Sequence, residues 1–446
     1  MLRSPAIVLL ITFCSHTRLV FAFLIHCGDS SGISDQSFRT CRNHVPKIFE
    51  AKVKVEAMPR AHSTAINRKN TEGDGSNDEA AQSLMELASS HFSSQALHAF
   101  VKMGVPDILG EAFMSVDKIC DNLDESLHGN SQRRNVNRDG LRRIMRLMVA
   151  EGVLIQNTAI DEKEIIFGLS AKGNLLRRGG RRDLASVVLH WMEAPLWNAW
   201  AELPNYIAGN FVVGQGTEGS GRIEKDVLPF EKANGMSSDD FYCQDNAESL
   251  KNANEFVRYI SNEEEKAVLS GFNWDQLSGK TLLDVGGHQG KVMGLIASKY
   301  PEIKCRCFDL PGIVSSATAP EGVELFGGDI FHGDLPSCDV IFMKHFLDKV
   351  MWDEEQTIQI LSSCRDALPD GGQVIIAEAV LPDDCSSTTG TNRLHLFIDV
   401  LFLLVGREAA RTESEWNDLA EKAGLRVDWV TATSAPSCYI IVLSKA

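Results

Sequence analysis

The chain has 446 residues, of which 44% are hydrophobic, and a formal net charge of -16 at pH 7. This length exceeds what one ordinary hydrophobic core accommodates, so the sequence favours two domains with extensions. The acidic balance argues against non-specific binding to nucleic acid or to an anionic membrane, since both attract cations. The 11 cysteines form no CxxC pair and no Cys/His cluster at zinc-finger spacing, so we expect no metal site.

The N-terminus has the composition of a targeting segment. Arg3 precedes a short apolar run, and Ala22 is the small residue expected before a signal peptidase cut, which predicts a signal peptide over residues 1–22. Residues 23–80 are polar and resemble a transit peptide or a disordered linker, and the run Asn67–Glu79 is predicted to be a solvated linker. A route to a plastid through the secretory pathway and an ordinary secretory route both remain open.

Helical spacing dominates from Ala81 to about Asn210. A first apolar stripe, ended by Gly104 and Pro106, contains Leu84, Leu87, Leu97, Phe100 and Val101. A second stripe over residues 141–148 precedes two short apolar runs, 153–155 and 165–169. A helix followed by a hairpin indicates a winged-helix arrangement. Arginines give this region a basic face, which we interpret as solvated surface because no base-reading side chains accompany it, and we expect no nucleic-acid partner.

Short β-rich runs alternate with helical segments from about Gly271 onward. Continuous apolar strands separated by helices indicate a parallel sheet covered on both faces. The last two runs, separated by a turn at residues 434–436, are expected to add antiparallel strands at one edge. The expected strands are 281–285, 303–308, 323–326, 340–343, 373–380, 427–430 and 438–443.

A glycine-rich turn, Gly286–Gly290, follows the first of these strands and precedes a helical run at 292–297. Glycines there let the backbone approach a ligand closely, and the helix N-terminus offers N–H groups without helical partners. Such a turn alone is weak evidence. It gains weight from Asp309 and Asp329, which end the next two strands, because an acid at the end of the second strand can accept ribose hydroxyls. The three strand ends predict one ligand cleft at the carboxyl edge of the sheet.

A series of motifs resembles the plant- and bacterial-type O-methyltransferases, the group of caffeic acid and acetylserotonin O-methyltransferases. The segment around Ser94–Asp107 resembles that family's dimerisation domain, so the resemblance covers about Ala81 to the end of the chain. The other matching motifs, in order, are Phe230–Met236, Leu283–Gly287, Phe308–Pro311, Gly327–Phe331, Ile341–Lys344, Ala367–Gly372, Ala377–Pro382 and Arg411–Trp416.

The resemblance implies an α/β fold: a Rossmann-like class I methyltransferase sheet over residues 246–446, with an N-terminal helical, winged-helix-like dimerisation domain over 81–245. It implies transfer of a methyl group from S-adenosyl-L-methionine to a small-molecule hydroxyl, phenolic, indolic or similar, by a homodimer. Most of the rate would then come from orientation of the acceptor, while the cofactor supplies the electrophilic methyl.

Cofactor roles follow from the resemblance where residues match. Gly286 and Gly287 would line the methionine end, and Asp309 would hold the ribose. Around the adenine and beside it, the resemblance places Asp329, Ile330, Phe331, Lys344 and Trp352.

The resemblance fails at the general base. The family's histidine falls on Asp348, four residues after Lys344, and an aspartate with a pKa near 4 is a weaker base than imidazole unless burial raises its pKa. We expect nearby His345 to be structural. Of the two glutamates that flank the base, Glu378 matches the first and Ala410 stands at the second, unless a gap restores Glu408.

Several alternatives remain open. The protein could methylate an acceptor that is already ionised, catalyse altered chemistry, or hold the cofactor as a non-catalytic dimer. A nicotinamide-dependent oxidoreductase is disfavoured by the Asp-x-Gly-Gly turn and the second acid at Asp329. His288, where the family has glycine, either narrows the cofactor site or leans outward. Candidates for an apolar acceptor pocket are Met192, Trp197, Trp200, Met236 and Phe241.

Overall fold

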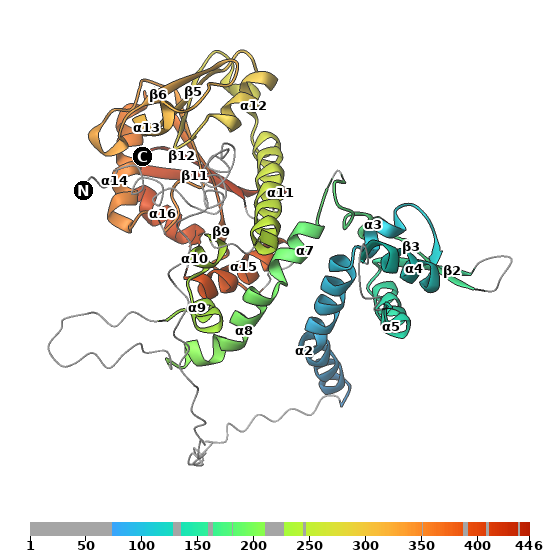
Figure 1. Ribbon diagram of the computed structural model, residues 1–446. Helices are drawn as coiled ribbons and strands as arrows, with labels where there is room; N and C mark the ends of the chain where they lie inside the picture. The colour runs from blue at the N-terminus through green and yellow to red at the C-terminus, as the bar shows by residue number, and fades with distance from the viewer. Residues whose placement is uncertain are drawn as a thin grey trace, which may run out of the picture.

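Two folded units make up the protein in the computed structural model (Figure 1). A helical N-terminal unit with a small sheet lies beside a larger unit built on a seven-stranded sheet. The expected signal peptide and Glu408 lie outside the part of the chain that the structure describes. The described residues are 74–127, 135–158, 164–180, 182–209, 227–243, 247–349, 351–386, 391–406, 410–435 and 438–446.

The N-terminal unit has the predicted winged-helix arrangement. A three-stranded antiparallel sheet in the order β1-β3-β2 packs with helices whose apolar residues form one core, including Phe100, Met145 and Phe167. Its elements are α2 (Asp74–Lys102), α3 (Val105–Leu109), β1 (Met114–Ser115), α4 (Val116–Leu127), α5 (Arg138–Ala150), β2 (Leu154–Thr158), β3 (Ile165–Leu169) and α6 (Ala171–Asn174). Gly104 ends α2 with φ 76°, a left-handed conformation that glycine adopts without steric cost.

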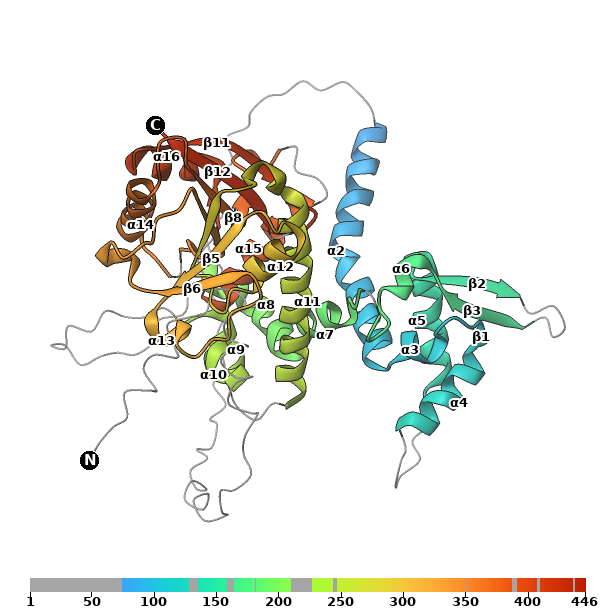
Figure 2. The ribbon, with the colours of Figure 1, turned by 90° about the horizontal axis from the view of Figure 1, so that it is seen from above.

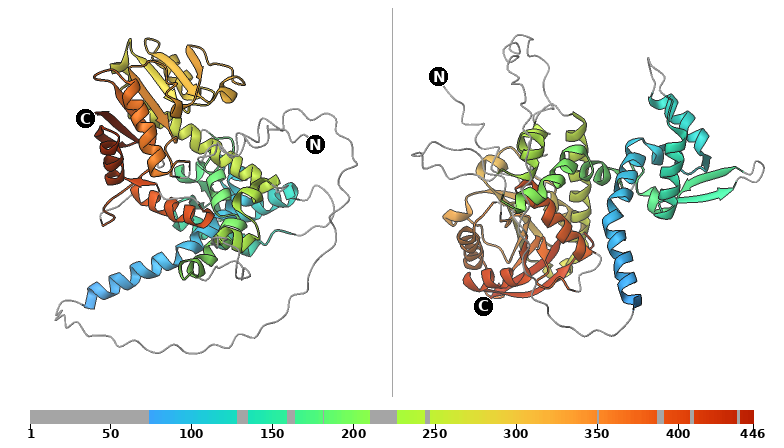
Figure 3. Two further views of the ribbon diagram at one scale, coloured as in Figure 1. Left: turned by 90° about the vertical axis from the view of Figure 1, so that its left-hand side faces the viewer. Right: turned by 90° about the horizontal axis from the view of Figure 1, so that it is seen from below.

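Helix α2 differs from the sequence prediction in two ways. It begins at Asp74, so the linker predicted over Asn67–Glu79 is wrong from residue 74 onward; acids at a helix start interact favourably with the helix dipole and make a polar run compatible with helix. Phe100 and Val101 of the predicted stripe are buried and Leu97 is partly buried against the same core, but Leu84 and Leu87 are exposed. The left view of Figure 3 shows the first turns of this helix, in blue, projecting beyond the other helices and strands.

A layer of helices connects the two units. Helix α7 contacts both α2 and α11, and in Figures 1 and 2 it lies between the N-terminal unit and α11. Helices α8, α9 and α15 contact one another. The bounds are α7 (Ala185–Trp191), α8 (Ala194–Ile207), α9 (Pro229–Asn234), α10 (Ser238–Cys243), α11 (Ala247–Gly271) and α15 (Thr391–Val405). Within the described residues, no helix is both long enough and apolar enough to cross a membrane.

The large sheet has the strand order β11-β12-β8-β7-β4-β5-β6. The strands from β8 to β6 are parallel, and β12 runs antiparallel to both β8 and β11, as predicted for that edge. The strands are β4 (Thr281–Val285), β5 (Lys304–Asp309), β6 (Val323–Gly327), β7 (Val340–Lys344), β8 (Gln373–Glu378), β11 (Leu425–Ala432) and β12 (Tyr439–Lys445). The run predicted at 373–380 divides at Ala379 into β8 and β9 (Val380–Leu381), which pairs with β10 (Arg411–Thr412).

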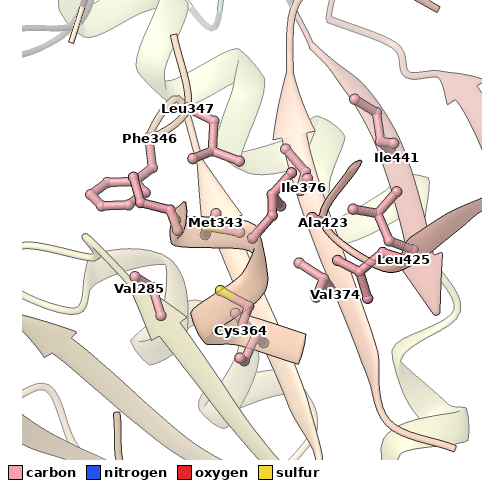
Figure 4. Close-up of a cluster of buried hydrophobic side chains, with 14 of the residues drawn as sticks. Val285, Met343, Phe346, Leu347, Cys364, Val374, Ile376, Ala423, Leu425 and Ile441 are labelled. Carbon is pink, nitrogen blue, oxygen red and sulfur yellow. The ribbon is translucent and has the colours of Figure 1, made fainter. Parts of the chain in front are cut away.

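Apolar side chains cover both faces of this sheet. Because alternate residues of a strand face opposite sides, Leu283 and Val285 join one core while Leu282 joins the other. The first core, shown in Figure 4, is closed by α14 (Glu354–Ala367) and α16 (Glu413–Lys422). The second is closed by α11 and α12 (Lys291–Lys299). Because the five strands from β8 to β6 run parallel, their carboxyl ends meet at one edge of the sheet. Figure 4 places Phe346 and Leu347 at this edge, just beyond β7.

Candidate active site

A cavity of about 300 Å³ lies at the carboxyl ends of β4, β5 and β6. Its volume is at the lower end of the range of small-molecule sites. Six of the ten predicted site residues line it: Gly286, Asp309, Asp329, Ile330, Phe331 and Trp352. The remaining wall consists of Val285, Phe308, Leu310, Gly328, Phe346 and Met351. Gly287, Lys344, Asp348 and Glu378 do not line this cavity.

The turn after β4 brings bare backbone to the cavity. Gly286 has φ 73°, and its N–H donates to the carbonyl of Phe308 over 2.8 Å. A Cβ on Gly286 would collide with the ring of Phe346, and one on Gly287 with the carboxylate of Asp284. Glycine at both positions is therefore required by close packing. His288 also has a positive φ, 55°, and its side chain is not part of the cavity wall.

Asp309 is fixed at the end of β5 by backbone donors. Its carboxylate accepts the N–H of His288 over 2.9 Å and the N–H of Leu310 over 2.7 Å. The residue is 5% exposed and lines the cavity. Each carboxylate oxygen can accept more than one hydrogen bond, so the group retains capacity for a diol that enters the cavity.

Asp329 stands at the start of a short 3-10 turn, η2 (Ile330–His332). Its carboxylate accepts the N–H of Phe331 over 2.9 Å and lies 3.3 Å from Nδ1 of His332. This local bonding holds Ile330 and Phe331 against the cavity. The second acid and its two apolar neighbours thus form one wall, as the sequence pattern predicts for a single cleft.

Aromatic rings form the wall that adjoins Phe331. Trp352 lies 5.3 Å from Phe331 and 5.7 Å from Phe346, measured between ring centroids. Its Nε1 donates to the carbonyl of Phe346 over 2.7 Å, which fixes the indole. The buried guanidinium of Arg411 donates to the carbonyl of Leu347 and so supports the loop that carries Phe346. An aromatic wall of this kind favours contact with a flat apolar ring.

The comparisons with known proteins agree on one family. The family model for the O-methyltransferase domain matches residues 218–426, and that for the O-methyltransferase dimerisation domain matches residues 85–178. The chain is 31% identical to a flavone 3'-O-methyltransferase of Chrysosplenium americanum over 68% of this chain and 82% of the relative. It is 30% identical to the (iso)eugenol O-methyltransferase of Clarkia breweri over 83% of this chain and 95% of the relative.

The chain belongs to the O-methyltransferase family.

Solved structures show the same fold. Human N-acetylserotonin methyltransferase in complex with S-adenosylmethionine is 19% identical with a TM-score of 0.58, covering 85% of this chain and 100% of that chain. A methyltransferase of calicheamicin biosynthesis with bound S-adenosylhomocysteine gives 22% identity and a TM-score of 0.62, covering 84% of this chain and 100% of that chain. The class I methyltransferase fold predicted from the sequence is confirmed.

The protein is an S-adenosylmethionine-dependent O-methyltransferase. The cavity fits the cofactor, because it combines a backbone cradle at Gly286, an acid able to accept two hydroxyls at Asp309, and an aromatic wall for a purine. When bound, the cofactor supplies an electrophilic methyl group on a sulfonium. The residues that would hold it are those lining the cavity, which leaves Gly287 with a packing role beside Asp284.

In this O-methyltransferase Lys344 does not line the cavity, although the resemblance places it beside the cofactor. Its Nζ lies 2.7 Å from Oε2 of Glu264, which comes from α11, and the side chain is nearly buried. Burial lowers the pKa of Lys344, but Glu264 outweighs it and the net effect raises the pKa. Lys344 is therefore a buried cation paired within the protein, and it lies outside the cavity wall.

The next residue completes a buried charge cluster, defined here as Glu264, Lys344, His345 and Glu378. His345 Nε2 lies 3.0 Å from Oε1 of Glu264, and Nδ1 lies 2.7 Å from Oε1 of Glu378. Burial alone lowers the pKa of His345, but the two carboxylates raise it to about 10. Burial raises the pKa of Glu264, but His345 and Lys344 lower it by more, so the pKa is held well below its usual value.

The sequence prediction missed Glu264. A signal for it exists: Glu264 shares its helical face with Ala267 and Val268, three and four residues on, which are fully buried. An acid in an apolar stripe requires a buried partner. Glu378, predicted beside a catalytic base, faces His345 here, while the second glutamate position, Ala410, directly precedes β10 and Glu408 lies outside the described residues.

Asp348, the residue at the position of the family's base, closes a turn. Its Oδ1 accepts the N–H of Met351 over 2.8 Å, and its carbonyl accepts the N–H of Trp352 over 3.2 Å. This turn places Met351 and Trp352 in the cavity wall. The geometry gives Asp348 a structural task, and its service as a base stays a prediction.

Proposed function

We propose that this enzyme methylates a hydroxyl group of a small aromatic acceptor, phenolic or indolic, and acts as a homodimer. The observation that carries the proposal is the single cavity in which Gly286, Asp309 and Asp329 meet beside an aromatic wall. The names of the relatives support the acceptor class, since they include flavone, caffeic acid and (iso)eugenol methyltransferases.

The acceptor side is proposed to be the helical layer of α8, α9, α10 and α15. This layer lies at the carboxyl edge of the sheet, because α15 contacts β9, which directly follows β8. It contains an aromatic group with Phe230, Phe241 and Tyr242 in ring contact, and Tyr242 donates to Glu193 over 2.7 Å. Of the predicted acceptor residues, Phe241 belongs to this group, while Met192 packs on the N-terminal core.

Calorimetry with S-adenosylhomocysteine and NAD in parallel tests the cofactor. We expect binding of S-adenosylhomocysteine alone, and binding of NAD alone would refute the proposed function. A methylation assay over phenols, indoles and carboxylates then tests the chemistry. Cofactor binding without any methylation across that panel would favour the non-catalytic dimer.

The position of Asp348 favours an acceptor that arrives ionised or loses its proton to water. Asp348→Asn keeps an acceptor for the N–H of Met351 but removes any base. We expect kcat within about threefold of wild type for this variant, since removal of a true general base costs about 10²–10⁴-fold. We also expect log kcat/KM over a series of phenols to follow the acceptor's own pKa.

Asp348→Ala is the matched control, because it lacks the oxygen that closes the turn. We expect it to weaken S-adenosylhomocysteine binding through displaced Trp352. A loss of a hundredfold or more in kcat for Asp348→Asn, with cofactor affinity unchanged and with recovery in Asp348→His, would make Asp348 the base instead.

Targeting by the N-terminus is proposed on sequence alone. Residues 1–22 are proposed as a signal peptide, with plastid and secretory destinations both open. Fusion of residues 1–80 to a fluorescent protein separates the two, since only a plastid route places the fluorescence within plastids. Cytosolic fluorescence from that fusion would contradict the proposed signal peptide.

A further inference from the structure

We propose that His345 is a positioning residue for methyl transfer: held between Glu264 and Glu378, it clamps the ends of β7 and β8 to α11 and thereby holds Phe346 against Gly286. The inference rests on the proposed methyl transfer at this cavity. It assigns a task to a histidine that stands outside the position of the family's base.

The first step of the argument is hydrogen-bond chemistry. A neutral imidazole has one N–H and one lone pair, so it can donate to only one partner. Both ring nitrogens of His345 face carboxylate oxygens, at 3.0 and 2.7 Å, and a carboxylate can only accept. The ring must therefore carry both protons, and His345 is a buried cation. It holds its proton at neutral pH and is excluded as the general base.

The second step is the balance of charge around the ring. The groups that face the cluster are Glu264 and Glu265 on α11, Lys344 on β7, Glu378 on β8, and Cys438 just before β12. Glu264 on α11 bonds both cations, Lys344 and His345, at the end of β7, and His345 in turn bonds Glu378 on β8, so two carboxylates and one imidazole join three elements. Removal of His345 would leave Glu378 buried without its cation, and a buried uncompensated charge is strongly unfavourable.

The third step is the backbone. His345 has φ 46°, a left-handed conformation that non-glycine residues rarely adopt outside strained sites. Its N–H donates to the carbonyl of Ala377 over 3.0 Å, so β7 is still tied to β8 at this residue. The ring contacts compensate for this backbone conformation, which turns the chain out of the sheet immediately before Phe346.

The fourth step links the clamp to the cavity. The ring of Phe346 occupies the space beside Gly286, where any side chain on Gly286 would collide with it. The carbonyl of Phe346 also accepts the indole N–H of Trp352. The conformation of His345 therefore sets two walls at once, the one beside Gly286 and the one that carries Trp352.

The direct test is the protonation state of the ring. In protein labelled with ¹⁵N-histidine, the His345 signals are assigned by their loss in His345→Asn. We expect both ring nitrogens of wild-type His345 to be protonated at pH 8, where an ordinary histidine is neutral. A neutral tautomer at pH 8 would overturn the clamp, whatever the enzyme's activity.

The functional test is cofactor affinity. Asn tolerates the left-handed backbone, so His345→Asn removes the cation with little added strain. We expect S-adenosylhomocysteine affinity to fall about tenfold or more, and KM for S-adenosylmethionine to rise more than KM for the acceptor. His345→Lys, which restores a cation, is expected to recover part of the affinity.

His395→Asn is the matched control, because His395 is also buried but its pKa is lowered by burial to about 4, so it is neutral. We expect its cofactor affinity to stay within about twofold of wild type. If His345→Asn folds and binds S-adenosylhomocysteine as wild type does, His345 does not position the cavity. Failure of wild type itself to bind would instead refute the proposed function, while the ring measurement would still judge the clamp.

Discussion

Individual residues at the cavity depend on backbone donors as much as on side chains. Asp309 is held by two N–H groups from the residues that follow β4 and β5, so its carboxylate is already oriented in the absence of any ligand. Such preorganisation lowers the entropy that binding would otherwise cost.

Asp309→Asn should weaken cofactor binding. The amide keeps the size of the carboxylate but replaces one acceptor by a donor, which would face a ribose hydroxyl or the N–H of His288. An unsatisfied buried polar group costs about 1–3 kcal/mol, so we expect roughly a 5- to 150-fold loss of affinity for S-adenosylhomocysteine by calorimetry. Unchanged affinity would remove Asp309 from the proposed cofactor site.

The buried charge cluster should also shape the pH dependence of stability. The pKa of His345 rises on folding from 6.5 to about 10, so its contribution is complete below pH 6.5 and is lost as the pH approaches 10. The pKa of Glu264 falls on folding from 4.5, so its contribution is complete above pH 4.5 and is lost as the pH falls further.

Denaturant unfolding of wild type and His345→Asn across pH 5–10 checks this prediction. We expect the difference in unfolding free energy to be largest near pH 5–6.5 and to shrink steadily toward pH 10. For His395→Asn we expect the difference in unfolding free energy to change with pH in the opposite direction. A histidine whose pKa is lowered by burial destabilises the folded wild type as the pH falls below 6.5. A difference for His345→Asn that is constant over this range would contradict a charged ring.

Site residues could be predicted where a strand end defines them. Asp309 ends β5 and Asp329 lies two residues after β6, and the sequence placed both at one cleft, where the structure shows them. Lys344 and Glu378 are also the last residues of strands, but their side chains face Glu264 on α11 and His345. No spacing rule reveals partners that lie 80 and 33 residues away in the sequence. The direction of a side chain at the final residue of a strand depends on tertiary contacts.

At the scale of elements, two capping boxes stabilise the helices behind the aromatic wall. Asp353 begins α14 by accepting the N–H of Gln356, whose side chain returns the bond, and Thr412 forms the same pair with Glu415 at α16. Both caps lie immediately after residues that support the cavity, Trp352 and Arg411. Each capping box therefore holds in place a residue that supports the cavity, Trp352 before α14 and Arg411 before α16.

Asp353→Ala should destabilise the protein by about 1 kcal/mol, because it leaves an N-terminal N–H group without its side-chain acceptor. The measurement is denaturant unfolding. Gln359→Ala, an exposed change within the same helix, should stay within a few tenths of a kcal/mol. Equal effects of the two substitutions would show that the cap is dispensable.

Strands were easier to predict than the helix ends. The apolar runs at 281–285, 323–326 and 340–343 match β4, β6 and β7 to within one residue, since strands buried on both faces are continuously apolar. The start of α2 was missed because a polar, acidic sequence is compatible both with a linker and with the first turns of a helix. Leu84 and Leu87 belong to the predicted apolar stripe and are nevertheless exposed, because periodicity identifies an apolar face but not what covers it.

At the scale of the whole molecule, that outer face of α2 supports the proposed homodimer. Four large apolar side chains there are 59–68% exposed, and at 100° per residue they span about half of the helix surface. They are Leu84, Met85, Leu87 and Phe92. Exposed apolar stripes of this kind mark interaction surfaces, and the dimerisation-domain model begins at residue 85.

The double substitution Leu84→Glu and Leu87→Glu should dissociate the dimer. Light scattering after gel filtration is expected to show a mass near the 49.1 kDa of one chain for this variant, and about twice that for wild type. Gln82→Glu adds charge on the opposite side of α2 and should leave the mass unchanged. A wild-type protein that is monomeric at micromolar concentration would contradict the proposed homodimer.

The order of the strands sends the chain to opposite faces of the sheet after two neighbouring strands. After β4 the chain crosses to the face covered by α12, and after β7, its neighbour, it crosses to the face covered by α14. The two departures leave a crevice between adjacent strand ends, whatever side chains border it. The crevice depends on strand order, whereas the reaction depends on particular side chains. A related protein that lost Asp309 and Asp329 would therefore keep a small-molecule binding site, and could evolve into a receptor with the same fold.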